Sequence, residues 1–208
     1  MIVFITAHDG PTSDNLIVAG HVADAAAVPL RGLDAVREGL ITALEADGGE
    51  PLLAMCHGSP AMLLGNDGEA ALTKADLAAL GTRESFALAC RTSEGLGPAV
   101  AAAGGTWFGY SGPINCLPTA EEVRPHFAGV VDFIVARFPG CREAAPAQAF
   151  IDDLDALTAA AFTAIEPIAG FEELHALRDI TRRLRVWLPN ETHVLAHPEA
   201  SPEPVFGP

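Results

Sequence analysis

Basic residues are scarce in this chain of 208 residues: 12 Lys and Arg stand against 27 Asp and Glu, a formal net charge of −15. Nucleic-acid binding normally needs a basic surface, so this balance argues against a nucleic-acid partner. Cysteines are also few. The four have no spacing typical of a disulfide framework, so we expect free thiols and a cytoplasmic protein. They are Cys56, Cys90, Cys116 and Cys141.

Long hydrophobic runs are missing as well. The longest uncharged stretch, residues 95–120, is interrupted by six Gly and three Pro, so we expect no membrane span and no membrane partner. The first nine residues have no basic leader, and their apolar run is too short for a signal peptide. We interpret this segment as the first strand.

Half of the residues are hydrophobic, only 6% are aromatic, and alanine is abundant, a composition typical of helices packed on a sheet. Short apolar runs predict strands, and apolar stripes at helical spacing predict helices. We therefore expect an α/β three-layer sandwich, with a mostly parallel central sheet flanked by helices and with extra C-terminal helices. Residues 1–208 form one predicted domain, in which 1–27 and 167–208 are extensions.

The expected elements follow one another along the chain. A helix capped by Ser13-Asp14 follows the first strand, a surface hairpin or loop occupies residues 58–72, and Thr73 caps a short helix. The last twenty residues, rich in Pro, are expected to be an extended tail or a short edge strand. Strands are predicted at 1–9, 28–30, 51–56, 85–90 and 106–110, and helices at 13–27, 34–46, 74–80, 97–103, 121–138, 147–165 and 171–187.

Two of the predicted strands end at reactive side chains. One apolar run is followed by His57 and the other by Cys90. Ligands of open α/β sheets bind at the carboxyl ends of the strands, so we expect an imidazole beside a thiol there. This pair is the minimum needed for nucleophilic catalysis by a thiol. Cys56 lies inside its strand and is interpreted as a core residue.

Four segments in this order resemble the caspase-like CHAT proteases of clan CD, over roughly residues 28–165. They are Cys56-His57-Gly58, Asn66-Asp67-Gly68-Glu69, Leu72-Thr73-Lys74-Ala75-Asp76-Leu77 and Ala89-Cys90-Arg91-Thr92-Ser93. The resemblance implies a caspase-hemoglobinase fold and a cysteine endopeptidase that works through an acyl-enzyme intermediate. It implies that Cys90 is the nucleophile, that His57 shuttles the proton, and that the N–H groups of Gly58 and Cys90 form the oxyanion hole.

The chain departs from the family pattern around the site. Arg91 stands where many members have an acidic or amide residue. Where members have a segment like Trp-x-Val-x-Asp, this chain has Trp107-Phe108-Gly109-Tyr110-Ser111. These departures leave the cleavage specificity undetermined, with Asp67, Arg91, Trp107 and Tyr110 as candidate substrate-binding residues. We expect a protein or peptide substrate, a separate regulatory partner, no cofactor and no metal.

Several alternatives remain open at this point. The protein could be a catalytically inactive caspase-fold binding or scaffold protein, or a hydrolase of a non-peptide amide or ester. Asp67 and Glu69 could bind a basic substrate side chain or calcium, or their turn could simply be solvated. Trp107 and Tyr110 could be core residues. The remaining alternatives are a zinc site formed by Cys56, His57, Cys90 and Cys116, a supporting pair His8-Asp9 near the site, and a solvated or partner-binding helix face with Arg178, Arg182, Arg183 and Arg185.

Overall fold

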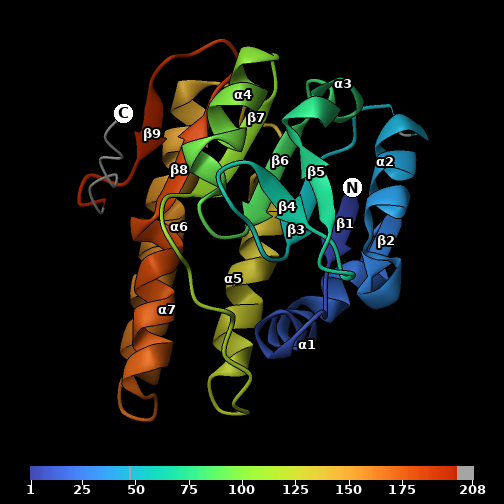
Figure 1. Cartoon of the computed structure of the whole chain (residues 1–208). Helices are drawn as coiled ribbons and strands as arrows, with labels where there is room; N and C mark the ends of the chain where they lie inside the picture. The colour runs from blue at the N-terminus through green and yellow to red at the C-terminus, as the bar shows by residue number, and fades with distance from the viewer. Residues whose placement is uncertain (47, 201–208) are drawn as a thin grey trace.

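A seven-stranded sheet runs through the middle of the computed structural model, which describes residues 1–46 and 48–200 (Figure 1). The strand order is β2-β1-β3-β6-β7-β8-β9. The first five strands in this order are parallel, whereas β8 and β9 each pair antiparallel with their neighbours. The strands are β1 (Ile2–Ile5), β2 (Val28–Arg31), β3 (Leu52–Met55), β6 (Glu84–Leu88), β7 (Thr106–Tyr110), β8 (Leu184–Trp187) and β9 (Val194–Ala196).

Helices cover both faces of the sheet, which confirms the predicted three-layer α/β sandwich. One face packs against α1 (Gly10–Ala25), α5 (Arg124–Arg137), α6 (Ala144–Ile165) and α7 (Phe171–Arg182). The other face packs against α2 (Arg37–Ala46), α3 (Leu77–Leu80) and α4 (Leu96–Ala102). No helix in the described part of the chain is long and apolar enough to cross a membrane.

Side chains of the central strands alternate between the two cores. In β3, Leu53 and Met55 belong to the core beneath α1 and α5, whereas Leu52 and Ala54 belong to the core beneath α2 and α4. Both faces are buried, which explains why these strands read as continuous apolar runs in the sequence. The alternation also decides which layer of helices meets the side chains that follow each strand.

The segment after β3 forms the predicted hairpin, β4 (Met62–Leu64) and β5 (Ala70–Thr73), which pair antiparallel. A short 3-10 turn, Lys74–Asp76, leads from β5 into α3. Thr73 caps this turn as predicted: its hydroxyl oxygen accepts from the N–H of Ala75, while the Asp76 carboxylate accepts from the N–H of Thr73.

The first strand ends at Ile5 instead of reaching the predicted residue 9, and two predicted helix boundaries are also wrong. The first helix begins at Gly10 and is capped by Asp9, not by Ser13-Asp14, because Asp9 and Thr12 form a reciprocal capping box. The last helix ends at Arg182 instead of continuing to residue 187. Residues 184–187 form β8 because pairing with the aromatic strand β7 overrides the helical pattern of this segment.

The arginine stripe predicted for one helix face is consequently divided. Arg185 is buried in β8, where it donates to main-chain carbonyls, so it does not belong to a solvated helix face. Arg182 and Arg183 form ion pairs with Glu199 and Asp179. The predicted edge strand near the C-terminus is present as β9, while Pro202, Pro204 and Pro208 of the predicted tail lie outside the described residues.

The ion pair between Arg37 and Asp76 joins the start of α2 to the turn after the hairpin. The hydrogen bonds from Arg37, at 2.6 and 2.9 Å, and those from Thr73 outweigh the opposing effect of burial and lower the pKa of Asp76 to about 2. Because the folded-state pKa is depressed, this stabilisation is fully present above about pH 4 and is lost as the pH falls towards about 2.

We predict that Asp76→Asn lowers the free energy of unfolding at pH 7 by about 1–2 kcal/mol. The loss should shrink as the pH falls through that window, because the wild-type carboxylate is protonated there. Urea denaturation at pH 7 and at pH 3 measures both effects. Asp67→Asn, in the exposed hairpin turn, is the matched control, and an equal loss in both variants would contradict the assignment.

Candidate active site

The parallel register of β3 and β6 brings the two reactive residues together. The last pair of this ladder is Met55 with Leu88, and a further main-chain bond runs from Cys56 N–H to the Leu88 carbonyl. His57 and Cys90 each lie two residues beyond that pair, so the same register sets them opposite each other. Paired strands lie about 4.8 Å apart, and the two residues therefore leave the sheet side by side. The predicted adjacency of the strand ends is confirmed.

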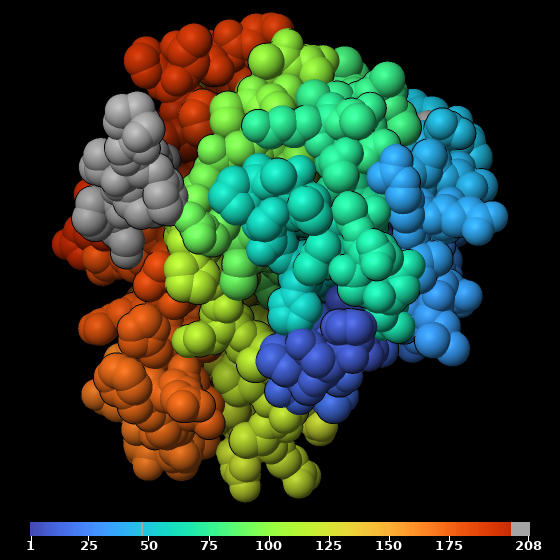
Figure 2. Space-filling view, in the orientation of Figure 1, coloured from blue at the N-terminus to red at the C-terminus, as the bar shows by residue number. Residues whose placement is uncertain are grey.

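Both residues line one cavity of about 290 Å³ at the carboxyl edge of the sheet. The first turns of α1 form one wall through Pro11, Thr12 and Asn15, and the loop after β7 forms another through residues 114–116. Figure 2 shows the start of α1, in dark blue, next to the hairpin, in teal. Asn66 joins the hairpin to the segment that leads into α1, since its side-chain oxygen accepts from Ala7 N–H at 2.7 Å.

His57 is held by Asp9. Nε2 of His57 lies 2.7 Å from Oδ2 of Asp9, while Oδ1 of the same carboxylate accepts from the N–H and hydroxyl of Thr12 at the start of α1. One carboxylate therefore caps the helix and orients the imidazole. The neighbouring His8 turns the other way, with its Nδ1 2.8 Å from the carbonyl oxygen of Asn66.

The negative charge on Asp9 determines which ring nitrogen of His57 faces it with a proton. Slight burial opposes ionisation, but the hydrogen bonds from His57 and Thr12 outweigh it and lower the pKa of Asp9 to about 2. An ionised carboxylate only accepts hydrogen bonds, so Nε2 of His57 carries the proton on the Asp9 side. In the neutral imidazole, Nδ1 is then the nitrogen that can accept a proton.

Cys90 is half-buried and contacts the loop after β7. The main-chain N–H of Ile114 donates to Sγ of Cys90 at 3.4 Å, and the thiol lies 3.6 Å from the Ile114 carbonyl oxygen. Within the described residues no hydrogen bond joins Cys90 to His57. Cys90 and His57 therefore line the same cavity, each held by a different neighbour: the thiol by a peptide N–H and the imidazole by a carboxylate.

The turn after Cys90 is backbone-strained and braced. Arg91 has a φ of 60°, in the left-handed region that residues with a side chain seldom adopt. Its N–H donates to the Gly112 carbonyl at 2.9 Å, and its side chain pairs with Glu94. The Glu94 carboxylate also accepts from the N–H of Gly112 at 2.9 Å. Strained turns of this kind occur preferentially at functional sites.

Gly58 is required by the close approach of the two strand ends. A Cβ at this position would lie 2.8 Å from the Cys90 carbonyl oxygen, 2.8 Å from Cγ2 of Thr92 and 2.9 Å from Cβ of Ala89. In the described part of the chain, the N–H groups of Gly58 and Cys90 donate to no main-chain carbonyl. Cys90 lines the cavity, and Gly58 follows the cavity residue His57 in the chain.

The other cysteines differ from Cys90 in their surroundings. Burial raises the pKa of Cys56 to about 12, and Cys56 packs in the core beneath α2 and α4, as predicted. Partial burial raises the pKa of Cys116, as does the nearby Asp14 carboxylate. Partial burial also raises the pKa of Cys141. Because the thiolate is the nucleophilic form, these three residues are disfavoured as nucleophiles at neutral pH.

None of the four candidate substrate-binding residues lines this cavity, although Arg91 lies in the turn directly after Cys90. Trp107 and Tyr110 are fully buried, so their predicted role in substrate binding is wrong and the alternative core role is confirmed. The physical reason is that β7 lies inside the sheet with helices on both faces, Trp107 facing one core and Tyr110 the other. Asp67 lies in the hairpin turn, where it accepts from Glu69 N–H, and it does not line the cavity.

Sequence reasoning did not identify Ile114, Thr12 or Asn15 as part of the site. Asn15 is buried, and its side-chain oxygen accepts from Leu117 N–H at 2.9 Å, which anchors the loop that contacts Cys90. The sequence Asp9-Gly10-Pro11-Thr12 could have indicated this part of the site. Its Asp suits a helix N-cap, its Pro suits the first helical turn, and its Thr lies three residues after the Asp, where it can complete the cap. It marks the start of α1 at the same sheet edge as His57 and Cys90.

The fold and the site together define an α/β protein with a thiol, an imidazole and a carboxylate at the carboxyl edge of its sheet. Comparisons with protein-family models, with curated proteins and with solved structures find no match for this chain. Among the described residues, no group of three or more His, Cys, Asp and Glu side chains is arranged to hold a metal ion.

We predict that Gly58→Ala lowers the free energy of unfolding by about 1–3 kcal/mol, because the added methyl group overlaps main-chain and side-chain atoms beside Cys90. Chemical denaturation measures the loss. Gly129→Ala is the control, since a Cβ at that position in α5 meets nothing within 4 Å. A Gly58→Ala variant as stable as the control would show that the two strand ends are not in close contact.

Proposed function

We propose that this protein is a cysteine endopeptidase in which Cys90 is the nucleophile and His57 is the proton shuttle. The observation that carries the proposal is the register of β3 and β6, which sets these residues opposite each other in one cavity. The resemblance to the caspase-like CHAT proteases supports the same roles. Asp9 extends the pair to three groups, because its carboxylate holds the imidazole at 2.7 Å.

The chemistry follows from these groups. Nδ1 of His57 accepts the thiol proton, and the Cys90 sulfur attacks the carbonyl carbon of the scissile peptide bond. The N–H groups of Gly58 and Cys90 donate to the oxyanion of the tetrahedral intermediate. When that intermediate collapses, the protonated His57 gives its proton to the leaving amine, and an acyl-enzyme remains. Water, deprotonated by His57, then hydrolyses the thioester and restores the thiol.

The charge beside the cavity bears on the substrate. A neighbouring cavity of about 450 Å³ shares Asn115 and Cys116 with the site and is lined by Asp14, Glu172 and Glu173. In a chain with a net charge of −15, this lining disfavours acidic side chains next to the cleaved bond. The substrates that fit the site best are therefore proteins or peptides with neutral or basic residues there.

A catalytically inactive caspase-fold binding protein is the second candidate. The observation that favours it is the contact of Cys90 with the Ile114 main chain, together with the lack of a described hydrogen bond to His57. In such a protein the cavity holds a peptide but does not cleave it. Turnover and thiol reactivity distinguish the two candidates.

We predict that Cys90→Ala and His57→Ala each abolish cleavage of a diverse peptide library, because each removes a group that the chemistry requires. Mass spectrometry of the digested library gives the measurement. Cys141→Ala, which removes a cysteine outside the cavity, is expected to cleave normally. Cleavage by either of the first two variants at the wild-type rate, or by none of the proteins including the wild type, would contradict the proposal.

We predict that Asp9→Ala lowers kcat about 10- to 100-fold with a smaller change in KM, because His57 loses the carboxylate that fixes its orientation and tautomer. Asp9→Asn keeps a side chain that caps α1 and separates the two roles of this residue. Compared with Asp9→Ala, the Asp9→Asn variant should regain the stability of the fold but not the full kcat of the wild type. If Asp9→Asn and the wild type had equal kcat, Asp9 would serve only as a helix cap.

A further inference from the structure

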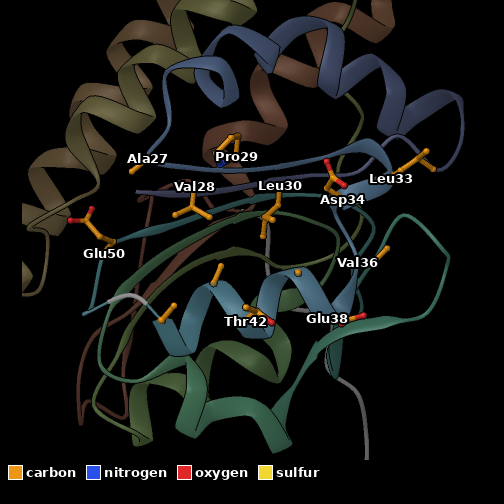
Figure 3. A pocket seen from close by; sticks show the side chains of 13 residues that line it. Ala27, Val28, Pro29, Leu30, Leu33, Asp34, Val36, Glu38, Thr42 and Glu50 are labelled. Atoms are coloured by element: carbon orange, nitrogen blue, oxygen red, sulfur yellow. The ribbon is translucent and has the colours of Figure 1, made fainter.

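A second concavity lies at the β2 edge of the sheet, opposite the edge formed by β9. It is a groove of about 920 Å³ between β2 and α2 (Figure 3). Its floor and walls are mainly apolar and include Val28 and Leu30 of the strand and Ala43 of the helix. Leu33 stands at one end of the groove and is 87% exposed. An exposed leucine beside an apolar groove is typical of an interaction surface.

The edge of the sheet itself is poorly suited to a bound strand. The Val28 N–H points inward and donates to the Met1 carbonyl, so the alternation of the strand turns the next residue, Pro29, outward. Proline has no N–H, and the open edge of β2 therefore lacks a donor at its centre. The occupant of the groove must bind through side chains and not through strand addition.

The charges of the groove are all of one sign. Its lining contains Asp34, Glu38 and Glu50 and, among the described residues, no Lys or Arg. Glu50 is paired with the N-terminal ammonium group at 2.6 Å. Asp34 lies beside Leu33 toward the other end, and Glu38 lies across the groove on α2 (Figure 3). No described ion pair involves either residue. The nearby Arg31 and Arg37 are paired with Asp24 and Asp76.

We propose that this groove docks an amphipathic helix of a partner protein, with apolar side chains in the groove and Lys or Arg above Asp34 and Glu38. Apolar residues at helical spacing fill a groove of this kind, and basic residues complement its acidic end. A second copy of the chain is a poorer occupant. The net charge of −15 makes two copies of the chain repel each other, and two of its basic helix residues, Arg137 and Arg182, are already paired with acidic residues of the same chain.

The test uses a fluorescein-labelled helical peptide with a leucine stripe flanked by lysines, and a matched peptide with glutamates in place of the lysines. Fluorescence anisotropy measures binding to the full chain carrying Cys90→Ala, so that proteolysis of the probe does not affect the result. The outcome is therefore independent of the proposed peptidase activity. We expect the lysine peptide to bind at least about tenfold more tightly than the glutamate peptide.

Variants locate the binding site. Leu33→Asp, and separately the pair Asp34→Lys and Glu38→Lys, should each weaken binding of the lysine peptide about tenfold or more. The pair Glu121→Lys and Glu122→Lys makes the same charge change at exposed positions outside the groove, and it should change affinity less than about twofold.

Two outcomes would overturn the proposal. Equal losses in the groove variants and the control pair would show a general attraction of a basic peptide to an acidic protein. A concentration-dependent dimer in sedimentation velocity that Leu33→Asp dissociates would show that the groove is occupied by a second copy of the chain.

Discussion

The parallel pairing of β1, β3 and β6 is the constraint on which the site depends. It aligns the three strands so that the chain leaves each one at the same edge, where Asp9, His57 and Cys90 follow. Because strand register is fixed by burial of both faces, a slip of one residue would move every side chain to the wrong core. The hydrophobic core therefore sets where the three residues leave the sheet, and the contacts with Asp9 and Ile114 then orient the His57 and Cys90 side chains.

Much of this arrangement could be predicted from the sequence because fully buried strands produce unbroken apolar runs. Those runs end close to the residues where the strands end. The residues that come next, His57 and Cys90, are therefore predicted at the carboxyl edge of the sheet. The interpretation of Cys56 as a core residue has a simple basis in the alternation of the strand: Ala54 and Cys56 face the core beneath α2 and α4, while Met55 faces the other core.

The parts that could not be predicted depend on contacts between distant segments. Nothing in residues 184–187 alone indicates a strand, because β8 exists only through its pairing with β7. Trp107 and Tyr110 follow Cys90 in the sequence, but their burial depends on both helical layers: Trp107 packs in the core beneath α2 and α4, and Tyr110 in the core that includes α5, α6 and α7. The contact of Ile114 with Cys90 likewise follows from a loop anchored by Asn15, one hundred and two positions away from the residue it binds.

The sheet edge that carries His57 and Cys90 is connected to the groove through the hairpin. Asn66 N–H donates to the Ala35 carbonyl at 2.7 Å, in the turn beside the groove, and the same asparagine binds Ala7 and His8 just before Asp9. A partner in the groove would thus contact a segment that is bonded to the support of His57. This connection consists of hydrogen bonds made by one residue of the hairpin.

The most direct test of the central claim is the relative reactivity of the cysteines. Brief treatment of the native protein with a limiting amount of iodoacetamide at neutral pH, followed by peptide mass spectrometry, gives the extent of labelling at each thiol. The account predicts that Cys90 is labelled well before Cys116 and Cys141, and that His57→Ala removes this advantage. Equal labelling of the three thiols, or a Cys90 rate unchanged in His57→Ala, would contradict it.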